Sequence, residues 1–249
     1  MRTKVALVTG AAAGIGAACA KRLAADGIAI GVLDVDAARC AGTVAAITAA
    51  GGRAIALGAD ISDRAAVRAA LARLRDAFGP VTIVVNNAGI TGFVPFEELT
   101  DEQWDRMYAV NVKGTFIVTQ EVLPDMKAAR WGRVVNISSS SAQTGSVHMA
   151  HYSSSKGAII SLTRTLAQEL GPLGITVNNI PPGSVMNTLM SEAARQRAGS
   201  RMESLLAALP VRRQGEPEDI ANACAWLCAE ASGYVTGQTI GVNGGRVVS

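Results

Sequence analysis

Short runs of apolar residues recur along this chain and alternate with longer stretches in which apolar residues return at helical spacing. Residues 17–26 and 64–78 are two of these Ala-rich helical stretches. Because the shorter runs are apolar on both faces, they predict the strands of a parallel sheet that helices cover on both sides. The predicted strands are residues 5–10, 28–34, 53–60, 82–89, 133–138, 175–180 and 238–245.

No linker of Pro, Gly and Ser and no internal repeat divides the 249 residues. The pattern therefore predicts one α/β domain over residues 1–249, a doubly wound parallel sheet of seven strands flanked by helices. Two helix starts carry signals of their own. The segment "TDEQ" at 100–103 has the form of a capping box, and "EPED" at 216–219 places Pro217 at a first helical position.

Composition narrows the classes of function. Hydrophobic residues make up 49% of the chain and charged residues 17%, which is enough for a substantial core. The net charge of +3 is small and spread out, which argues against nucleic-acid binding. We find neither an apolar run long enough for a membrane span nor a signal-peptide pattern. The four cysteines form no CxxC pair, so we expect a reduced, cytoplasmic protein without a metal site.

A glycine-rich segment follows the first predicted strand. The sequence "TGAAAGIG" at 9–16 places Gly10, Gly14 and Gly16 where the chain would turn into the first helix. Glycines there let the backbone turn tightly and approach a pyrophosphate at the positive end of the helix. The spacing is GxxxGxG rather than the commoner GxGxxG, so the position directly after a strand is what favours dinucleotide binding.

The second predicted strand ends in an acid, Asp34, 24 residues beyond Gly10. A carboxylate at this place can accept hydrogen bonds from an adenosine ribose, and it would repel a 2′-phosphate. Neither Ala13 in the glycine turn nor Val35 after the acid offers a cation to hold such a phosphate. We therefore expect NAD rather than NADP.

Tyr152 stands four residues before Lys156 in "YSSSK". On a helix these side chains share a face, so that a phenol lies beside an ammonium. A free phenol, with a pKa of about 10, is a poor base at neutral pH, and a nearby positive charge lowers that pKa. The pair is a candidate for acid/base chemistry at an alcohol or carbonyl oxygen. The alternative is an exposed helix start on which the lysine merely extends into solvent.

Together these segments resemble the short-chain dehydrogenase/reductase family over essentially the whole chain. The resemblance rests on the joint order and spacing of eight short features, which is far more specific than any one of them. They are TGAAAGIG (9–16), Asp34, Asp60, NNAG (86–89), Asn111, Ser139, YSSSK (152–156) and PPGSV (181–185). The resemblance implies a Rossmann-type dehydrogenase.

In such enzymes a tyrosine, a lysine, a serine and an asparagine form one catalytic group. The family's spacing of 13 residues between serine and tyrosine selects Ser139 among four successive serines. Tyr152 would exchange a proton with the substrate oxygen, and Ser139 would position that oxygen. Lys156, with the charge of the oxidised nicotinamide, would stabilise the phenolate and would also hold the nicotinamide ribose. Asn111 would connect Lys156 to a proton path through an ordered water.

The resemblance also implies a set of cofactor contacts. They are expected from Gly10, Ala13, Gly14, Ile15, Gly16, Asp34, Asp60, Ile61, Asn86, Tyr152, Lys156 and Val185. Where the family often has a threonine, this chain has Asn187 followed by Thr188, and the choice between them stays open. His148 and His151 could line the substrate pocket, but we expect them at the surface, and no metal-ligand spacing includes them.

Residues 186–209 resemble the family's mobile substrate lid. Methionines and leucines give this segment an apolar stripe, which favours an apolar substrate, although ordinary helix packing would explain the stripe equally well. We expect hydride transfer between NAD(H) and a small-molecule substrate, a secondary alcohol or ketone that is alicyclic, steroid-like or hydroxyacyl, in a homotetramer. The alternatives are an NADPH-dependent 3-oxoacyl reductase and, from another class, a non-catalytic dinucleotide-binding scaffold.

Overall fold

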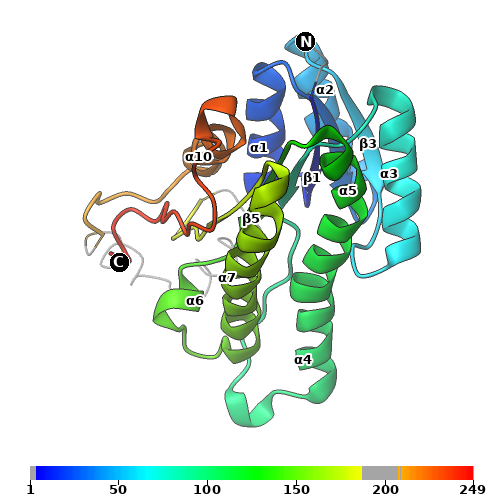
Figure 1. Ribbon diagram of the computed structural model, residues 1–249. Helices are drawn as coiled ribbons and strands as arrows, with labels where there is room; N and C mark the ends of the chain where they lie inside the picture. The colour runs from blue at the N-terminus through cyan, green and yellow to red at the C-terminus, as the bar shows by residue number, and fades with distance from the viewer. Residues whose placement is uncertain (1–3, 187–206, 208, 249) are drawn as a thin grey trace.

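Six of the predicted apolar runs form the strands of one parallel sheet, in the order β3-β2-β1-β4-β5-β6. The computed structural model describes residues 4–186, 207 and 209–248. The strands are β1 (Val5–Thr9), β2 (Ala29–Asp34), β3 (Ala54–Gly58), β4 (Ile83–Asn86), β5 (Gly132–Ile137) and β6 (Ile175–Ile180). The predicted doubly wound α/β architecture is therefore confirmed (Figure 1).

The seventh predicted strand, 238–245, does not form. In the described part of the chain this segment meets β6 and the loop after it through two isolated bridges, Asn179 to Thr239 and Pro182 to Val242. Gly237 directly before the segment and Gly244 near its end have φ values of +73° and +67°, so the backbone leaves the extended conformation at both places. The prediction of seven strands was wrong by one for this reason.

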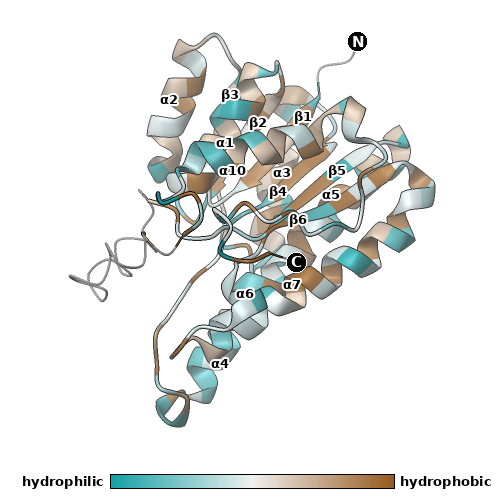
Figure 2. Ribbon diagram, turned by 90° about the vertical axis from the view of Figure 1, so that its left-hand side faces the viewer, coloured by the Kyte–Doolittle hydropathy of each residue, from teal (hydrophilic) through white to brown (hydrophobic). Residues whose placement is uncertain are grey.

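Helices cover both faces of the sheet, as the two-sided apolar pattern predicts. Side chains such as Val8, Ile30 and Val85 pack with α1 (Gly14–Ala25), α2 (Ala41–Ala49) and α10 (Pro217–Cys228). On the other face, side chains such as Leu7 and Val84 pack with α3 (Arg64–Phe78), α5 (Thr115–Ala129) and α7 (Ala150–Leu170). Figure 2 shows the hydrophobic strands enclosed between these two layers.

The shorter elements lie in the connections. They are η1 (Ala37–Cys40), η2 (Phe96–Glu98), α4 (Asp101–Tyr108), η3 (Ala109–Gly114), α6 (Ser141–Thr144), η4 (Gly171–Leu173) and η6 (Glu230–Ser232). Both predicted helix starts are confirmed: Thr100 and Gln103 form a reciprocal capping box before α4, and Pro217 opens α10. No helix in the described ranges is long and apolar enough to cross a membrane.

The strand order reverses between β1 and β4, and hydrogen bonds join the loops that follow these two strands. The Asn87 side chain donates to the carbonyls of Thr9 (2.9 Å) and Gly10 (3.0 Å), while the Thr9 hydroxyl accepts from the Asn87 and Ala88 amides. In doubly wound sheets this reversal opens a crevice at the carboxyl ends of the strands. The glycine turn and the NNAG segment therefore meet at the natural ligand site of this fold.

Candidate active site

Tyr152 and Lys156 lie on one buried face of α7, with only 6% and 4% of their surfaces exposed. The Lys156 ammonium lies 6.0 Å from the centre of the Tyr152 ring. It donates a hydrogen bond of 2.9 Å to the carbonyl of Ile137, at the carboxyl end of β5. The alternative of an exposed helix start is thereby excluded, because neither side chain extends into solvent.

The Ser139 hydroxyl meets the Tyr152 phenol through a side-chain hydrogen bond. A second serine holds Ser139 in place: the Ser141 hydroxyl and amide donate to Ser139 Oγ at 2.9 and 3.2 Å. Ser139 follows the end of β5, and Tyr152 lies in the first turn of α7. The structure thus brings together the serine and the tyrosine that the spacing of 13 residues pairs.

Burial controls the charges of this group. It raises the pKa of the Tyr152 phenol, and the hydrogen bond with Ser139 opposes that rise. It lowers the pKa of Lys156 to about 8. In the protein alone, removal from water therefore has the largest effect on the pKa of Tyr152. The lowering expected from Lys156 together with the charge of the oxidised nicotinamide stays a prediction.

Asn111 lies in η3, a π-helical turn between α4 and α5. Its side-chain oxygen accepts from the Ile90 amide (2.8 Å), and its nitrogen donates to the Ile90 carbonyl (3.0 Å) and to the Ser155 hydroxyl (3.0 Å). These bonds tie the segment after NNAG to α7. A Cβ on Gly89 would lie 3.0 Å from Asn111 Oδ1 and 3.3 Å from Lys156 Nζ, so Asn111 and Lys156 meet at this glycine.

A cavity of about 430 Å³ opens at the carboxyl ends of β1, β2, β3 and β4. Seven of the residues predicted to contact a cofactor line it: Gly10, Ala13, Gly14, Ile15, Asp34, Asp60 and Ile61. The first residue of α1 lies at this cavity, and no side chain caps that helix end, so its free amide groups suit a phosphate. A Cβ on Gly10 would lie 2.9 Å from the Ala88 backbone, which explains glycine here. The residues present fit a dinucleotide.

The remaining predicted contacts lie elsewhere. Gly16 packs against the turn, since a Cβ on it would lie 2.2 Å from the Gly10 carbonyl oxygen. The Asn86 amide is buried and donates to the Thr119 hydroxyl (2.9 Å) and to the Asn136 side chain (2.8 Å), so any cofactor contact of Asn86 must come from its main chain. Val185 lines a separate cavity of about 300 Å³ beside Asn243.

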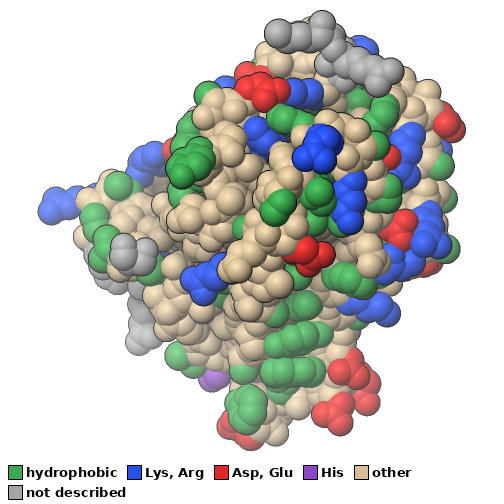
Figure 3. All heavy atoms as spheres, viewed as in Figure 1, with side chains coloured by type: hydrophobic (Ala, Val, Ile, Leu, Met, Phe, Trp, Pro, Cys, Tyr) green, Lys and Arg blue, Asp and Glu red, His purple; other side chains and the backbone are tan. Residues whose placement is uncertain are grey.

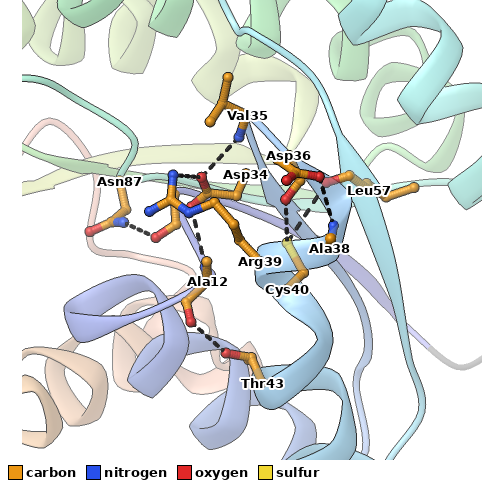
Figure 4. Close-up of polar contacts among 11 residues, drawn as sticks. Ala12, Asp34, Val35, Asp36, Ala38, Arg39, Cys40, Thr43, Leu57 and Asn87 are labelled. Carbon is orange, nitrogen blue, oxygen red and sulfur yellow. Dashed lines mark hydrogen bonds and ion pairs between the residues drawn. The ribbon is translucent and has the colours of Figure 1, made fainter.

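Three polar side chains that line the main cavity were not among the predicted contacts: Arg39, Asn87 and Arg106. Asn87 was within the NNAG motif, but its side-chain contacts depend on the folded loop. Arg39 forms an ion pair of 2.9 Å with Asp34, and Arg106 one of 3.1 Å with Asp60 (Figure 4 draws the first pair). The sequence offered no motif for either arginine. A cation therefore does stand beside Asp34, although neither Ala13 nor Val35 supplies it.

The wall beside Tyr152 is apolar. Met107 and Met149 are buried against the tyrosine, and the partly buried Ile90 and Phe93 pack with them. This wall favours an apolar group next to the reacting oxygen. Most of the predicted lid, 186–209, lies outside the described residues; Met186, Ala207 and Leu209 are the described ones.

The two histidines differ from one another. His148 is exposed, as expected, but His151 is 2% exposed, with Nε2 facing the Gly92 backbone, so the prediction of a surface position was wrong for His151. It lies directly before Tyr152 at the buried start of α7. In the described ranges, no group of three or more His, Cys, Asp or Glu side chains is arranged to hold a metal ion.

Comparison with known proteins places this site in a family. The family model described as short chain dehydrogenase matches residues 4–199. The chain is 42% identical to the short-chain reductase protein NovJ of Streptomyces niveus, over 97% of this chain and 93% of the relative. It is 38% identical to (3R)-3-hydroxyacyl-CoA dehydrogenase of Mus musculus, over 98% and 96%. A crystal structure of a variant of actinorhodin polyketide ketoreductase with NADPH superposes with a TM-score of 0.93 at 34% identity, covering 98% of this chain and 97% of that one. Our chain belongs to the short-chain dehydrogenase family.

Proposed function

We propose that the protein interconverts a secondary alcohol and a ketone by hydride transfer to and from NAD(H). The observation that carries this proposal is the buried group of Ser139, Tyr152 and Lys156 beside a cavity that fits a dinucleotide. When bound, the nicotinamide supplies the hydride acceptor or donor. The chain's own residues then have to hold the substrate oxygen and move its proton.

Tyr152 is the proposed acid/base. In alcohol oxidation its phenolate takes the hydroxyl proton, and in ketone reduction its phenol returns one to the carbonyl oxygen. Ser139, already bonded to Tyr152, places the substrate oxygen within reach of the phenol. Because burial alone raises the pKa of Tyr152, the phenolate requires positive charge close by, which Lys156 supplies while it is protonated.

Asn111 is proposed as a positioning residue in this group. Its three hydrogen bonds to Ile90 and Ser155 fix the distance between the NNAG loop and α7. Lys156 lies at the same point, next to Gly89. An ordered water between Asn111 and Lys156 would continue the proton path toward solvent.

NAD(H) is the proposed coenzyme because Asp34 faces the cavity at the end of β2. Its carboxylate suits the two hydroxyls of an adenosine ribose and opposes a 2′-phosphate. Asp60, at the same edge, would flank the adenine. The pKa of Asp60 is lowered by hydrogen bonds from Ser62 and by Arg106, so this carboxyl is ionised at neutral pH.

The proposed substrates are apolar, and 3-hydroxyacyl thioesters are the first class to test. The wall of Met107, Met149, Ile90 and Phe93 supports an apolar group beside the reacting carbon. The names of several relatives, such as (3R)-3-hydroxyacyl-CoA dehydrogenase and acetoacetyl-CoA reductase (Cupriavidus necator, 37% identical), support the thioester class. The same apolar wall also supports alicyclic and steroid-like alcohols as proposed substrates.

A second candidate is an NADPH-dependent 3-oxoacyl reductase. Two observations favour it: Arg39 stands beside Asp34, and the similar ketoreductase was crystallised with NADPH. The two candidates share Tyr152 and its partners and differ in the coenzyme and the working direction.

A homotetramer is proposed as well. Hydrophobic side chains gather on the face over α4 and α5 (Figure 3), where the Trp104 and Tyr108 rings stack at 5.1 Å and Phe116 is 43% exposed. An apolar surface of this kind is typical of subunit contacts. Light scattering on the purified protein would measure the mass, and a monomer would contradict the proposal.

The test of the proposed reaction is direct. The purified protein is incubated with NAD and a panel of 3-hydroxyacyl thioesters, alicyclic alcohols and hydroxysteroids, and NADH is followed by its absorbance. The reverse panel uses the ketones with NADH and NADPH. Reduction of 3-oxoacyl thioesters with NADPH but not with NADH would favour the NADPH-dependent 3-oxoacyl reductase. No turnover with any combination of coenzyme and substrate would favour the non-catalytic dinucleotide-binding scaffold.

A further inference from the structure

Arg39 turns back from η1 toward the strand that precedes it. Asp36 caps η1 by accepting a hydrogen bond of 2.9 Å from the Ala38 amide, which sets the direction of this turn. As a result the Arg39 guanidinium reaches Asp34 at the end of β2, with 2.9 Å between Nη1 and Oδ1 (Figure 4). Both side chains line the cavity of about 430 Å³.

The two members of this ion pair are held very differently. Asp34 is 12% exposed and also accepts from the Val35 amide (2.9 Å) and the Ala12 amide (3.4 Å), so the backbone fixes its position. The Arg39 side chain is 47% exposed, and Asp34 is its one polar partner among the described residues. A guanidinium has five N–H donors, so most of those of Arg39 are directed to solvent at the mouth of the cavity.

We infer that Arg39 is a specificity-determining residue that turns from Asp34 to the 2′-phosphate of a phosphorylated dinucleotide, so that this site accepts NADP(H) as well as NAD(H). The inference deepens the proposed function, on whose dinucleotide site it rests. With NAD(H), Arg39 stays on Asp34 and the remaining carboxylate lone pairs accept from the ribose. With NADP(H), the guanidinium moves to the phosphate, which it can bind through two parallel hydrogen bonds.

The exposure of Arg39 makes this exchange easy. Because its side chain is 47% exposed, water solvates the guanidinium and weakens the ion pair, while the backbone amides still hold the carboxylate of Asp34 when Arg39 leaves it. Phosphate carries more charge than a carboxylate and offers more acceptors, so the guanidinium gains by the move. The carboxylate that would repel a 2′-phosphate thus brings its own counter-charge.

Arg106 is the other cation of the cavity, and it is less suited to this role. It has two partners, Asp60 (3.1 Å) and the Ser62 hydroxyl (3.4 Å), on the loop after β3. Asp34, which holds the ribose in the proposed function, instead ends β2. Arg106 is therefore the natural competitor in the experiment.

The experiment measures binding of two cofactor fragments, ADP and 2′,5′-ADP, by isothermal titration calorimetry on the full chain. These probes report the site without any turnover. In the wild-type protein the two affinities should agree within about tenfold. In Arg39→Gln the affinity for 2′,5′-ADP should fall by about tenfold or more, since hydrogen bonds between charged groups are lost, while that for ADP changes less than about threefold. Arg39→Lys should keep part of the affinity for 2′,5′-ADP.

The matched control is Arg22→Gln. Arg22 is a partly exposed arginine of α1 that is ion-paired with Asp26 at the C-cap of that helix. It does not line the cavity, so both affinities should stay at the wild-type values. Equal losses of both fragments in Arg39→Gln, or a selective loss of 2′,5′-ADP in Arg106→Gln instead, would overturn the role of Arg39 and leave the proposed reaction standing. If neither fragment binds the wild-type protein, the dinucleotide site and this inference fail together.

Discussion

At one end of the site Tyr152 and Lys156 are almost fully buried and held by Ser139 and the β5 backbone, whereas at the other end Asp34 meets the half-exposed side chain of Arg39. Burial raises the cost of every charge and strengthens every hydrogen bond at the first end. Solvent weakens both effects at the second. The proposed catalytic end should therefore lose its function with any single change, while changes at the end of β2 should shift the coenzyme preference gradually.

The largest effect is expected from Tyr152→Phe. Removal of the phenol oxygen takes away the only proposed proton donor and leaves the ring in place, so turnover should fall by about a thousandfold or more. Affinity for NADH, measured by fluorescence titration, should stay within about threefold of wild type because the ring packing is kept. Turnover near the wild-type rate would remove Tyr152 from the mechanism.

The next effect is steric and concerns Gly16→Ala. The new Cβ would lie 2.2 Å from the Gly10 carbonyl oxygen and 2.6 Å from Nδ2 of the Asn87 side chain. The clash should lower the free energy of unfolding by about 3 kcal/mol, as measured by urea denaturation, and weaken ADP binding. Gly42→Ala in α2 is the control, because nothing lies within 4 Å of its Cβ. That variant should be stabilised by about 0.5–1 kcal/mol; a loss equal to that of Gly16→Ala would show that crowding is not the cause.

A third change tests whether the buried lysine destabilises the fold that it serves. Lowering the pKa of Lys156 from 10.5 to about 8 corresponds to a cost of about 3 kcal/mol for the buried charge. Lys156→Met also removes the hydrogen bond to the Ile137 carbonyl, which would reduce the gain in stability by about 1 kcal/mol. Lys156→Met should therefore be inactive and yet more stable than wild type at neutral pH, by about 2 kcal/mol.

The stability difference between wild type and Lys156→Met should depend on pH. Between pH 8 and pH 10.5 the unfolded chain binds more protons at Lys156 than the folded chain does, so wild-type stability gains with rising pH there. The advantage of the methionine variant is fully present below about pH 8 and shrinks toward pH 10.5. Urea denaturation of both proteins at several pH values measures the difference, and a constant difference would contradict the assigned pKa.

The smallest effect is expected at the exposed end, from Asp34→Ala. Loss of the carboxylate should lower kcat/KM with NAD by about tenfold, whereas kcat/KM with NADP should rise, because Arg39 is released and the repulsion is gone. Asp26→Ala is the control, since Asp26 is an ion-paired carboxylate at the C-cap of α1, outside the cavity. If both coenzymes lose equally, Asp34 supports the fold and does not discriminate between them.

The sequence predicts well those features that depend on neighbouring residues or on a pattern that recurs along the chain. The spacing of Tyr152 and Lys156 is a property of any helix, and the six strands that form were each visible as apolar runs. Arg39 could not be found in this way, because the direction of its side chain depends on the cap that Asp36 makes to η1. Burial of His151 and the rise in the pKa of Tyr152 depend on residues distant in sequence. The same holds for the side chain of Asn86, which is directed to Thr119 and Asn136.

Because Asn111 lies in the π-helical turn at Ala109–Gly114, its position depends on the number of residues in that turn. Such a turn holds one residue more than an α-helix would, so α4 and α5 are out of step with each other by one position. Each residue of an α-helix turns by about 100°, so deletion of a single residue from this turn would let the helix close and rotate one half against the other. Asn111 would then lose its hydrogen bonds to Ile90 or to Ser155, even though every residue of the proposed catalytic group was still present. An engineer who exchanges this helix with that of a relative must therefore conserve its length before its composition.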